Sequence, residues 1–379
     1  MNLDLTPEQA AIQKMAREFA EGVVAPGAAE RDQTHRFPLE IFRQMGELGF
    51  FGIPFSEAYG GLGGDYVSYA LAVEEISRAD GGVGLSYAAH VSIGIGPVYA
   101  FGTEEQKRRW LPGAIRGEYL ASFGLTEPGA GSDAAATRTT AVRDGDGWVL
   151  NGQKVFITNA GYAGYIVCTA VTEPGQGHRG ISNFIVPTDA PGFSTGQPYR
   201  KMGLRSSDTR PVYFDNCRIP GDSLLGQPGE GFRQFMVTLD AGRISIAAFA
   251  LGIARAAYEA ALRYAQERVQ FGRAISKFQA IQFKLADMAT EIEVARGQIL
   301  KAAWLKDQGR PYTKEAAMAK LFASEVATRV CHQAVQIHGG YGYIQDYPVE
   351  RYYRDVRLGE IGEGTSEVQR LVIAREIGC

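Results

Sequence analysis

The chain of 379 residues has few of the features that mark metal centres, nucleic-acid binding or membrane insertion. Its four cysteines are scattered and form no CxxC pair, so neither a disulfide framework nor a zinc site is expected, and a reducing compartment fits. The net charge of −3 and the lack of a long basic run argue against nucleic acid as a partner. No apolar run approaches the roughly 20 residues of a membrane span.

Several catalytic motifs are also missing. The chain has no GxSxG, HExxH or P-loop sequence, which disfavours a serine hydrolase, a zincin and an NTPase. His332 and His338 are six residues apart and do not share a helix face, so we expect no metal site. Residues 1–5 have neither a basic start nor an apolar signal core, and we expect a cytoplasmic protein.

The chain is too long for one hydrophobic core, and its pattern changes twice. Helical patterns dominate residues 1–120, short β-rich runs dominate residues 121–228, and long helical patterns return over residues 229–379. We therefore predict an α+β multi-domain fold. It has a helical N-terminal domain, an antiparallel β middle domain and a C-terminal four-helix bundle.

Helix-start signals appear at Thr6 and Thr103, each followed three residues later by glutamine in a capping box. Further helices are predicted by the patterns over residues 37–48 and 67–79, then from about Phe232, across residues 278–309, across residues 313–338 and after Ser366. Ser366 and Gln369 are expected to form the capping pair of the last helix.

In the middle region the β-rich runs are short and separated by turn residues. They cover residues 148–150, 155–158, 165–171, 184–186 and 212–214. Asn151-Gly152 predicts a hairpin between the first two runs.

Glu363 lies between two glycines, immediately before the last predicted helix. Glycine lets the backbone approach a ligand closely. A carboxylate held at such a junction in an apolar pocket can have a raised pKa and act as a general base. Taken alone, the motif is more typical of a solvated surface glutamate, because most glutamates are exposed.

Three other segments carry possible binding chemistry. Residues 124–133 are rich in turn formers, and residues 129–134 imitate a GxGxxA dinucleotide fingerprint. Residues 137–142 look like a strand where a Rossmann site needs a helix, so the functional interpretation is a polar loop against a cofactor. Residues 336–343 hold three glycines at a helix end, where backbone could face a pyrophosphate. Arg268 could meet a phosphate or simply complement a helix dipole.

Together these segments resemble the acyl-CoA dehydrogenase family over nearly the whole chain. The resemblance rests on the α–β–α order and on two long patterns. The first is residues 124–133. The second begins at Gln336 with Gly339, Gly340, Gly342 and Tyr343, continues through Asp346, Arg351 and Asp355, and leads to Glu363-Gly364-Thr365.

The resemblance implies FAD as the cofactor. Leu125, Thr126 and Ser132 would lie along the flavin and ribityl chain, and Phe156 and Thr158, on one strand face, would cover the flavin face away from the substrate. Other matching positions would hold a neighbouring subunit's FAD, and Thr365 and Glu367 would add a last contact. The positions for the neighbouring FAD are Arg268, Phe271, Gln279, Gln336, Gly339 and Gly340. A shared site implies an oligomer, in this family usually a homotetramer built as a dimer of dimers.

The family reaction is α,β-dehydrogenation of an acyl-CoA thioester to the trans-2-enoyl-CoA, in fatty acid β-oxidation or branched-chain oxidation, with electrons passed to an electron-transfer flavoprotein. By resemblance Glu363 is the base, and its backbone N–H with a ribityl hydroxyl stabilises the developing enolate. The implied substrate contacts are Ser132, Asp240, Arg243 and Gly364.

This sequence departs from relatives at two positions. Members with isovaleryl-type specificity carry the base on an earlier helix, where this chain has Gly242, so Glu363 is the only matched base. Gly362 stands where many members have tyrosine, which leaves room for a branched or bulky acyl group. Residues 84–90 resemble the isovaleryl branch and favour the same expectation.

Two other functions remain open. A flavin oxidase or monooxygenase of the same fold is one, although the hydroxylating enzymes lack the glutamate. A non-catalytic helical binding protein is the other, and it predicts a colourless product.

Overall fold

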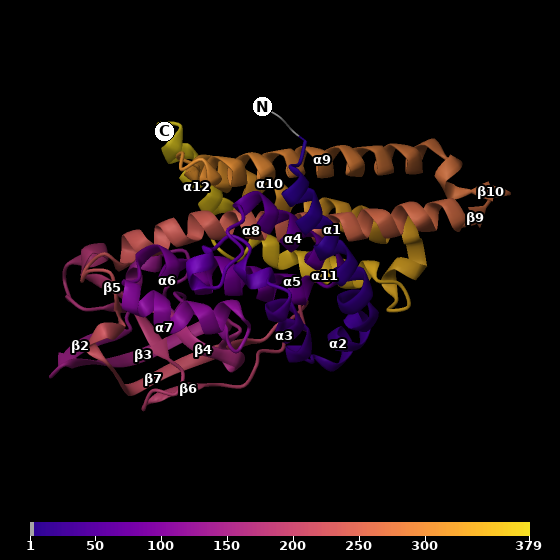
Figure 1. Cartoon of the computed structure of the whole chain (residues 1–379). Helices are drawn as coiled ribbons and strands as arrows, with labels where there is room; N and C mark the ends of the chain where they lie inside the picture. Colours follow the sequence, from indigo (N-terminus) through magenta and orange to yellow (C-terminus); the bar gives the residue numbers. More distant parts are fainter. Residues whose placement is uncertain (1–3) are drawn as a thin grey trace.

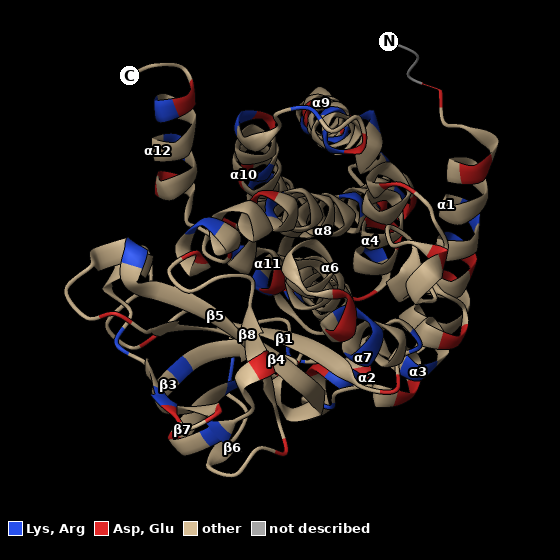
Figure 2. Ribbon diagram, turned by 60° about the vertical axis from the view of Figure 1, so that its left-hand side comes forward, with Lys and Arg blue, Asp and Glu red and all other residues tan. Residues whose placement is uncertain are grey.

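The computed structural model describes residues 4–379, which form two helical regions with a β-sheet at one side of them (Figure 1). Residues 1–3, part of the stretch in which no targeting signal was expected, lie outside the described residues. The predicted fold class is confirmed: an N-terminal helical region, a middle sheet and a C-terminal helical region follow one another along the chain. In the view of Figure 2 basic and acidic residues are interspersed along the helices.

The N-terminal helices begin where the capping signals predicted. Thr6 and Thr103 each accept the backbone N–H of the glutamine three residues later, and each glutamine side chain bonds back to the cap. The helices are α1 (Pro7–Phe19), α2 (Ala28–Thr34), α3 (Leu39–Glu47), α4 (Tyr66–Ala79), α5 (Gly81–Ala88), the π-helical turn η5 (Ala89–Ile95), α6 (Gly96–Phe101) and α7 (Glu104–Ile115).

The middle region forms an eight-stranded sheet in the order β6-β7-β3-β2-β4-β5-β8, with β1 paired to β4. The sheet is antiparallel, as expected, except that β4 pairs in parallel with β1 and, at one position, with β2. The strands are β1 (Leu120–Gly124), β2 (Thr140–Asp144), β3 (Gly147–Thr158), β4 (Ala163–Val171), β5 (Ile181–Pro187), β6 (Phe193–Thr195), β7 (Thr209–Ile219) and β8 (Leu224–Leu225).

The hairpin predicted at Asn151-Gly152 is wrong. The strand β3 runs through both residues, and the turn lies earlier, where Asp144 pairs with Gly147 across two residues. Gly152 instead marks a bulge against β7, and a Cβ there would lie 2.5 Å from Thr139 Oγ1. Close backbone approach, not a turn, therefore requires this glycine.

The C-terminal region is built on the long helices α8 (Gly231–Glu267), α9 (Gln279–Asp307) and α10 (Thr313–His338), which were predicted from their apolar stripes. The short strands β9 (Val269–Gln270) and β10 (Arg273–Ala274) form a hairpin between α8 and α9, at the far end of the helices from the sheet in Figure 1. The short helix α11 (Val349–Val356) and the last helix α12 (Ser366–Glu376) complete the region.

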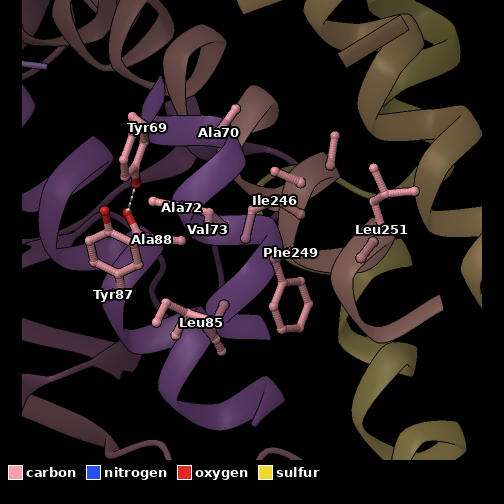
Figure 3. Packing of buried hydrophobic residues seen from close by; sticks show 14 of the residues in the cluster. Tyr69, Ala70, Ala72, Val73, Leu85, Tyr87, Ala88, Ile246, Phe249 and Leu251 are labelled. Atoms are coloured by element: carbon pink, nitrogen blue, oxygen red, sulfur yellow. Dashed lines mark hydrogen bonds between the residues drawn. The ribbon is translucent and has the colours of Figure 1, made fainter. Parts of the chain in front are cut away.

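The helix α8 lies in the centre of the molecule, and α4, α5, α9 and α10 pack around it. Figure 3 shows one part of this core, where Ile246 and Phe249 of α8 lie beside Val73 and Leu85. The helix is long and apolar enough to cross a membrane, with a mean hydropathy of 1.5 over 18 residues, but 78% of that window is buried inside the protein. Its composition is that of a core helix.

Candidate active site

The loop that carries Glu363 has an unusual backbone. Glu363 has a φ of 53° and Gly364 a φ of 92°, so two consecutive residues adopt left-handed conformations before α12 begins. For a non-glycine residue this conformation is uncommon and marks a site held by its surroundings. The cap of α12 is Thr365, whose hydroxyl accepts the N–H of Val368, and not Ser366 as predicted.

Two buried side chains bind the carbonyl groups of this loop. The ammonium of Lys320 donates to the Gly364 carbonyl at 2.6 Å. The amide of Gln369 donates to the carbonyls of Gly364, at 2.9 Å, and of Glu363, at 3.2 Å. Both side chains are fully buried, and the sequence reasoning missed both as site residues. The signal for Lys320 was present, since it is a lysine within a stripe of buried alanines on α10.

The Glu363 carboxylate points into the protein towards α8. Its Oε2 atom is buried and has no hydrogen-bond partner. Burial raises the pKa of this carboxyl to about 7, against the opposing effect of the Lys320 and Arg243 charges. A buried, unpartnered carboxylate whose pKa lies near neutrality has the properties of a general base.

Gly242 provides the space that this carboxylate occupies. A Cβ atom at Gly242 would lie 2.0 Å from Glu363 Oε2 and 3.1 Å from Ile93 Cγ2. The carboxylate therefore stands against the bare backbone of α8. Any side chain at position 242 has to displace it.

This geometry predicts that Gly242→Ala lowers activity without lowering stability. The methyl group should displace the flexible end of Glu363, and a displacement of about 1 Å can cost roughly 10²-fold in rate. Alanine in a helix is about 1 kcal/mol more favourable than glycine, so the melting temperature should not fall. The matched control is Gly297→Ala in α9, where an added Cβ meets nothing within 4 Å. Wild-type turnover by Gly242→Ala would contradict this placement of the base.

Arg243 and Asp240, predicted to contact substrate, lie beside Gly242 on α8. They form an ion pair, and Thr313 Oγ1 donates to Asp240 Oδ2 at 2.6 Å. Arg243 is buried, its Nε has no partner, and burial lowers its pKa, while burial raises the pKa of Asp240. The unpartnered Nε leaves one guanidinium donor available to a ligand.

The turn η5 connects this site to the sheet. Ile93 faces Gly242, and a Cβ at the next residue, Gly94, would lie 2.7 Å from the Ala121 carbonyl of β1. The strand β1 leads directly into Leu125 and Thr126, which were predicted to lie along the flavin. One helical turn therefore separates the carboxylate from the strand that presents the flavin-side loop.

A buried ion pair fixes that loop. Lys154 Nζ lies 2.8 Å from Glu127 Oε1 and 3.3 Å from the Leu125 carbonyl oxygen. Burial alone would raise the pKa of Glu127, but the Lys154 charge and hydrogen bonds from Thr137 and Thr139 hold it at about 2. The Thr126 carbonyl accepts Val155 N–H at 2.8 Å. The loop that contains Leu125 and Thr126 is therefore held by an ion pair and by backbone hydrogen bonds.

The remaining flavin-side residues present an open surface. Ser132 is exposed, and a Cβ at Gly129 or Gly131 would meet nothing within 4 Å, so this backbone is accessible to a ligand. Phe156 is 65% exposed with a φ of 60°, at a bulge in β3, and its ring centroid lies 5.2 Å from that of Tyr199. Thr158, which ends β3, is half-buried. The exposed aromatic ring is available for stacking.

The predicted adenosine and pyrophosphate residues gather at the other end of α8. Arg268, Gly339 and Gly340 line a cavity of about 470 Å³, and the Arg268 guanidinium lies 5.5 Å from the centre of the Tyr341 ring. A Cβ at either glycine would meet nothing within 4 Å, so both face open space. Phe271, between β9 and β10, is 93% exposed, and Gln279 and Gln336 are exposed on the neighbouring helices.

The two groups of predicted cofactor residues are far apart in one chain. The N-terminal end of α8 is bound to the sheet, where Asn183 donates to the Gly231 carbonyl. Its C-terminal end leads to Arg268 and Phe271. At 1.5 Å per residue, the 26 residues from Gly242, which lies near the flavin-side strand, to Arg268 span about 39 Å. The two groups therefore cannot bind the same cofactor molecule within one chain.

Among residues 4–379 no cluster of histidine, cysteine, aspartate and glutamate could hold a metal ion. His338 is instead buried, with its ring stacked on Tyr264 at a centroid distance of 4.3 Å. The ring packs in the core between helices.

Comparison with known proteins matches all three regions to one family. The models of the acyl-CoA dehydrogenase N-terminal, middle and C-terminal domains match residues 6–118, 122–217 and 229–378. A probable acyl-CoA dehydrogenase of Bacillus subtilis (strain 168) is 59% identical over 378 residues, 100% of both chains. A short-chain specific acyl-CoA dehydrogenase of Clostridium acetobutylicum is 49% identical over 377 residues, again 100% of both.

Solved structures agree with these relatives. Butyryl-CoA dehydrogenase from Megasphaera elsdenii superposes with a TM-score of 0.98 at 45% identity and 100% coverage of both chains. A chain from the work on the electron transferring flavoprotein of Acidaminococcus fermentans gives a TM-score of 0.99 at 51% identity, also with 100% coverage of both. An acyl-CoA dehydrogenase from Bacillus anthracis complexed with FAD gives 0.94 at 36% identity, covering 99% of this chain and 67% of that one.

The fold and the buried carboxylate therefore belong to a flavin-dependent oxidoreductase. The chain is a member of the acyl-CoA dehydrogenase family, whose cofactor is FAD. The predictions of the family, of the enzyme class and of the cofactor are confirmed.

Proposed function

We propose that this enzyme oxidises a short acyl-CoA thioester between its α and β carbons and passes the electrons to an electron-transfer flavoprotein. The observation that carries the proposal is the Glu363 carboxylate, buried and without a partner against Gly242. The short-chain specific relatives and butyryl-CoA dehydrogenase favour a short acyl group. The similar chain from the Acidaminococcus fermentans work on electron transferring flavoprotein favours such a flavoprotein as the electron acceptor.

In this proposal Glu363 removes the α proton of the thioester. The low-dielectric surroundings that raise its pKa also make the carboxylate a stronger base towards that weakly acidic proton. The bound FAD would accept the β hydride. Arg243, with its free Nε, and Asp240 would hold the CoA part of the substrate, with Ser132 and Gly364 as further contacts.

The residues at both ends of α8 fit FAD. The exposed backbone at Gly129 and Gly131 and the ring of Phe156 suit a flavin and ribityl chain. The cationic, glycine-lined cavity at Arg268 suits an anionic pyrophosphate. Because the two groups are too distant for one cofactor, we propose that two chains share each FAD in a homotetramer, a dimer of dimers. We propose a cytoplasmic location in β-oxidation, without nucleic-acid or membrane partners.

The test of the activity is anaerobic mixing of the purified protein with straight and branched acyl-CoAs while the flavin absorbance is followed. Rapid bleaching by butyryl-CoA and slower bleaching by long-chain or branched thioesters is the expected result. Faster bleaching by a branched thioester would show that the preferred substrate is branched and not straight-chain. A yellow protein that no acyl-CoA bleaches would instead favour the oxidase or monooxygenase alternative, and a colourless one the binding protein.

Replacing Arg268 by alanine is expected to weaken FAD retention. The guanidinium is the cation that lines the cavity, and its loss removes a charge-assisted contact to phosphate, worth about 1.5–3 kcal/mol or roughly 10–100-fold in affinity. The measurement is the ratio of flavin to protein after purification and dialysis. The control is Arg273→Ala in β10, whose guanidinium lies 4.2 Å from the Phe278 ring centre. Full flavin occupancy in Arg268→Ala would exclude the phosphate role.

A further inference from the structure

Two buried side chains bind the backbone of the Glu363 loop, and neither has a role in the proposed reaction itself. Glu363 and Gly364 are consecutive left-handed residues, and the carbonyl oxygen of each accepts a hydrogen bond from a fully buried donor. The donors come from two different helices, Lys320 from α10 and Gln369 from α12. We call Lys320 and Gln369 the loop clamp.

The geometry of the clamp is tight. A Cβ at Gly364 would lie 2.7 Å from Gln369 Nε2, so the amide fits directly against the bare glycine backbone. Lys320 is 0% exposed and donates over 2.6 Å to the Gly364 carbonyl. A lysine is seldom buried without a carboxylate partner, because desolvation of its charge is costly. Within residues 4–379 the ammonium of Lys320 hydrogen-bonds only that backbone carbonyl.

The charge of Lys320 also faces the carboxylate. The charged groups that act on Lys320 are Glu363, Glu360 and Glu367 from the loop and α12 side, and Arg243 from α8. Those that act on Glu363 are Lys320 and Arg243, and the buried hydroxyls of Tyr66 and Tyr69 on α4 sense its charge in turn. Arg243 is neutralised by Asp240, whereas Lys320 has no paired carboxylate. Lys320 is therefore the stronger of the two cationic influences on Glu363.

We propose that Lys320 and Gln369 are positioning residues for the base. Together they fix the two peptide carbonyls that aim the Glu363 carboxylate at Gly242, and Lys320, bonded to the Gly364 carbonyl next to the base, also supplies a positive charge that favours the carboxylate form. The inference rests on the proposed function of Glu363. It divides the clamp into a geometric part, which both residues share, and an electrostatic part, which only Lys320 supplies.

The test compares Lys320→Met and Gln369→Met by anaerobic stopped-flow reduction of the flavin with butyryl-CoA between pH 5.5 and 9. Both variants are expected to lose about 10–100-fold in the limiting reduction rate, with substrate affinity and flavin content near wild type, because a displaced base affects the chemical step. Only Lys320→Met should move the pH midpoint of reduction upwards, because the cation that favours the carboxylate form is gone. Gln369→Met should leave the midpoint unchanged.

The control is Arg370→Met, which removes an exposed link between the same two helices. Arg370 bonds Glu325 of α10 at 2.7 Å and does not contact the carbonyls of the Glu363 loop. Its reduction rate and pH midpoint should remain those of the wild type. Lys320→Gln, which keeps a donor without a charge, should recover part of the rate but keep the shifted midpoint.

Several outcomes would overturn the proposal. Wild-type reduction rates in both clamp variants would exclude the geometric role, and an unmoved midpoint in Lys320→Met would exclude the electrostatic one. A loss confined to substrate affinity would assign the clamp to binding. If Lys320→Met fails to fold, Gln369→Met still decides the geometric role and Lys320→Gln the electrostatic role. Failure of Glu363 as the base would show separately, as wild-type reduction by Glu363→Gln.

Discussion

Glu363→Gln is expected to retain its yellow colour and bind acyl-CoA, yet to reduce its flavin about 10²–10⁴-fold more slowly than the wild type. Glutamine has the same shape but cannot accept the α proton, and general base catalysis typically contributes that much. Oε2 of Glu363 has no hydrogen-bond partner, so the substitution breaks no hydrogen bond of that atom. The measurement is the anaerobic reduction rate at saturating butyryl-CoA.

The wild-type rate should also depend on pH. Below a pKa of about 7 the Glu363 carboxyl is protonated and cannot accept a proton, so the rate of flavin reduction should rise with pH through that value.

A matched control for Glu363→Gln is Glu360→Gln, because Glu360 lies three residues before the base and pairs with Arg357 at 2.7 Å. If Glu363→Gln reduces its flavin as fast as Glu360→Gln does, another residue is the base.

Lys154→Met is expected to destabilise the protein by about 3–5 kcal/mol and to lower its flavin content. The substitution leaves the Glu127 carboxylate buried without its cation, which is among the largest costs a single change can produce. It also removes the donor to Leu125, at the start of the flavin-side loop. Denaturant unfolding and the absorbance ratio of flavin to protein measure the two effects.

The matched control is the double variant Lys154→Met/Glu127→Gln. Removing the second charge leaves a neutral amide in place of an unpaired carboxylate, so part of the lost free energy of unfolding should return. The flavin-side loop would still lack its lysine, and flavin content should recover less than stability. A single variant as stable as the wild type would show that Thr137 and the backbone donors alone suffice for Glu127.

The sequence predicted the fold best where local patterns and packing agree. The apolar stripe from Ile281 to Ile299 repeats over many turns, and α9 forms there. It failed at Gly152, where the hairpin signal of Asn-Gly is overridden by the close approach of Thr139. The sequence patterns also predicted no helix over residues 81–101, where the structure has α5, η5 and α6. Glycines there weaken the local signal, yet the Asp80 cap and the packing of Gly84 against Ser77 require them.

The candidate site was predictable only in part. Glu363 and Arg268 were found because short motifs and the family resemblance single them out. The clamp residue Lys320 lies 43 positions away from Glu363 in the chain and outside the motifs, so only the folded structure brings the two together. The same holds for Gly242, whose role as empty space for Glu363 Oε2 depends on a contact between α8 and the distant loop before α12.

The helix α8 passes from the sheet, past the base at Gly242, to the cavity at Arg268 without interruption. Inserting one residue between Arg243 and Arg268 would turn everything beyond it by about 100° and advance it by about 1.5 Å. The hairpin that carries Phe271 would then face a different direction, and the buried face of α8 that packs against α4, α5 and α10 would be turned with it. Single insertions and deletions should therefore be far less tolerated in this stretch than in the exposed turn at residues 174–177.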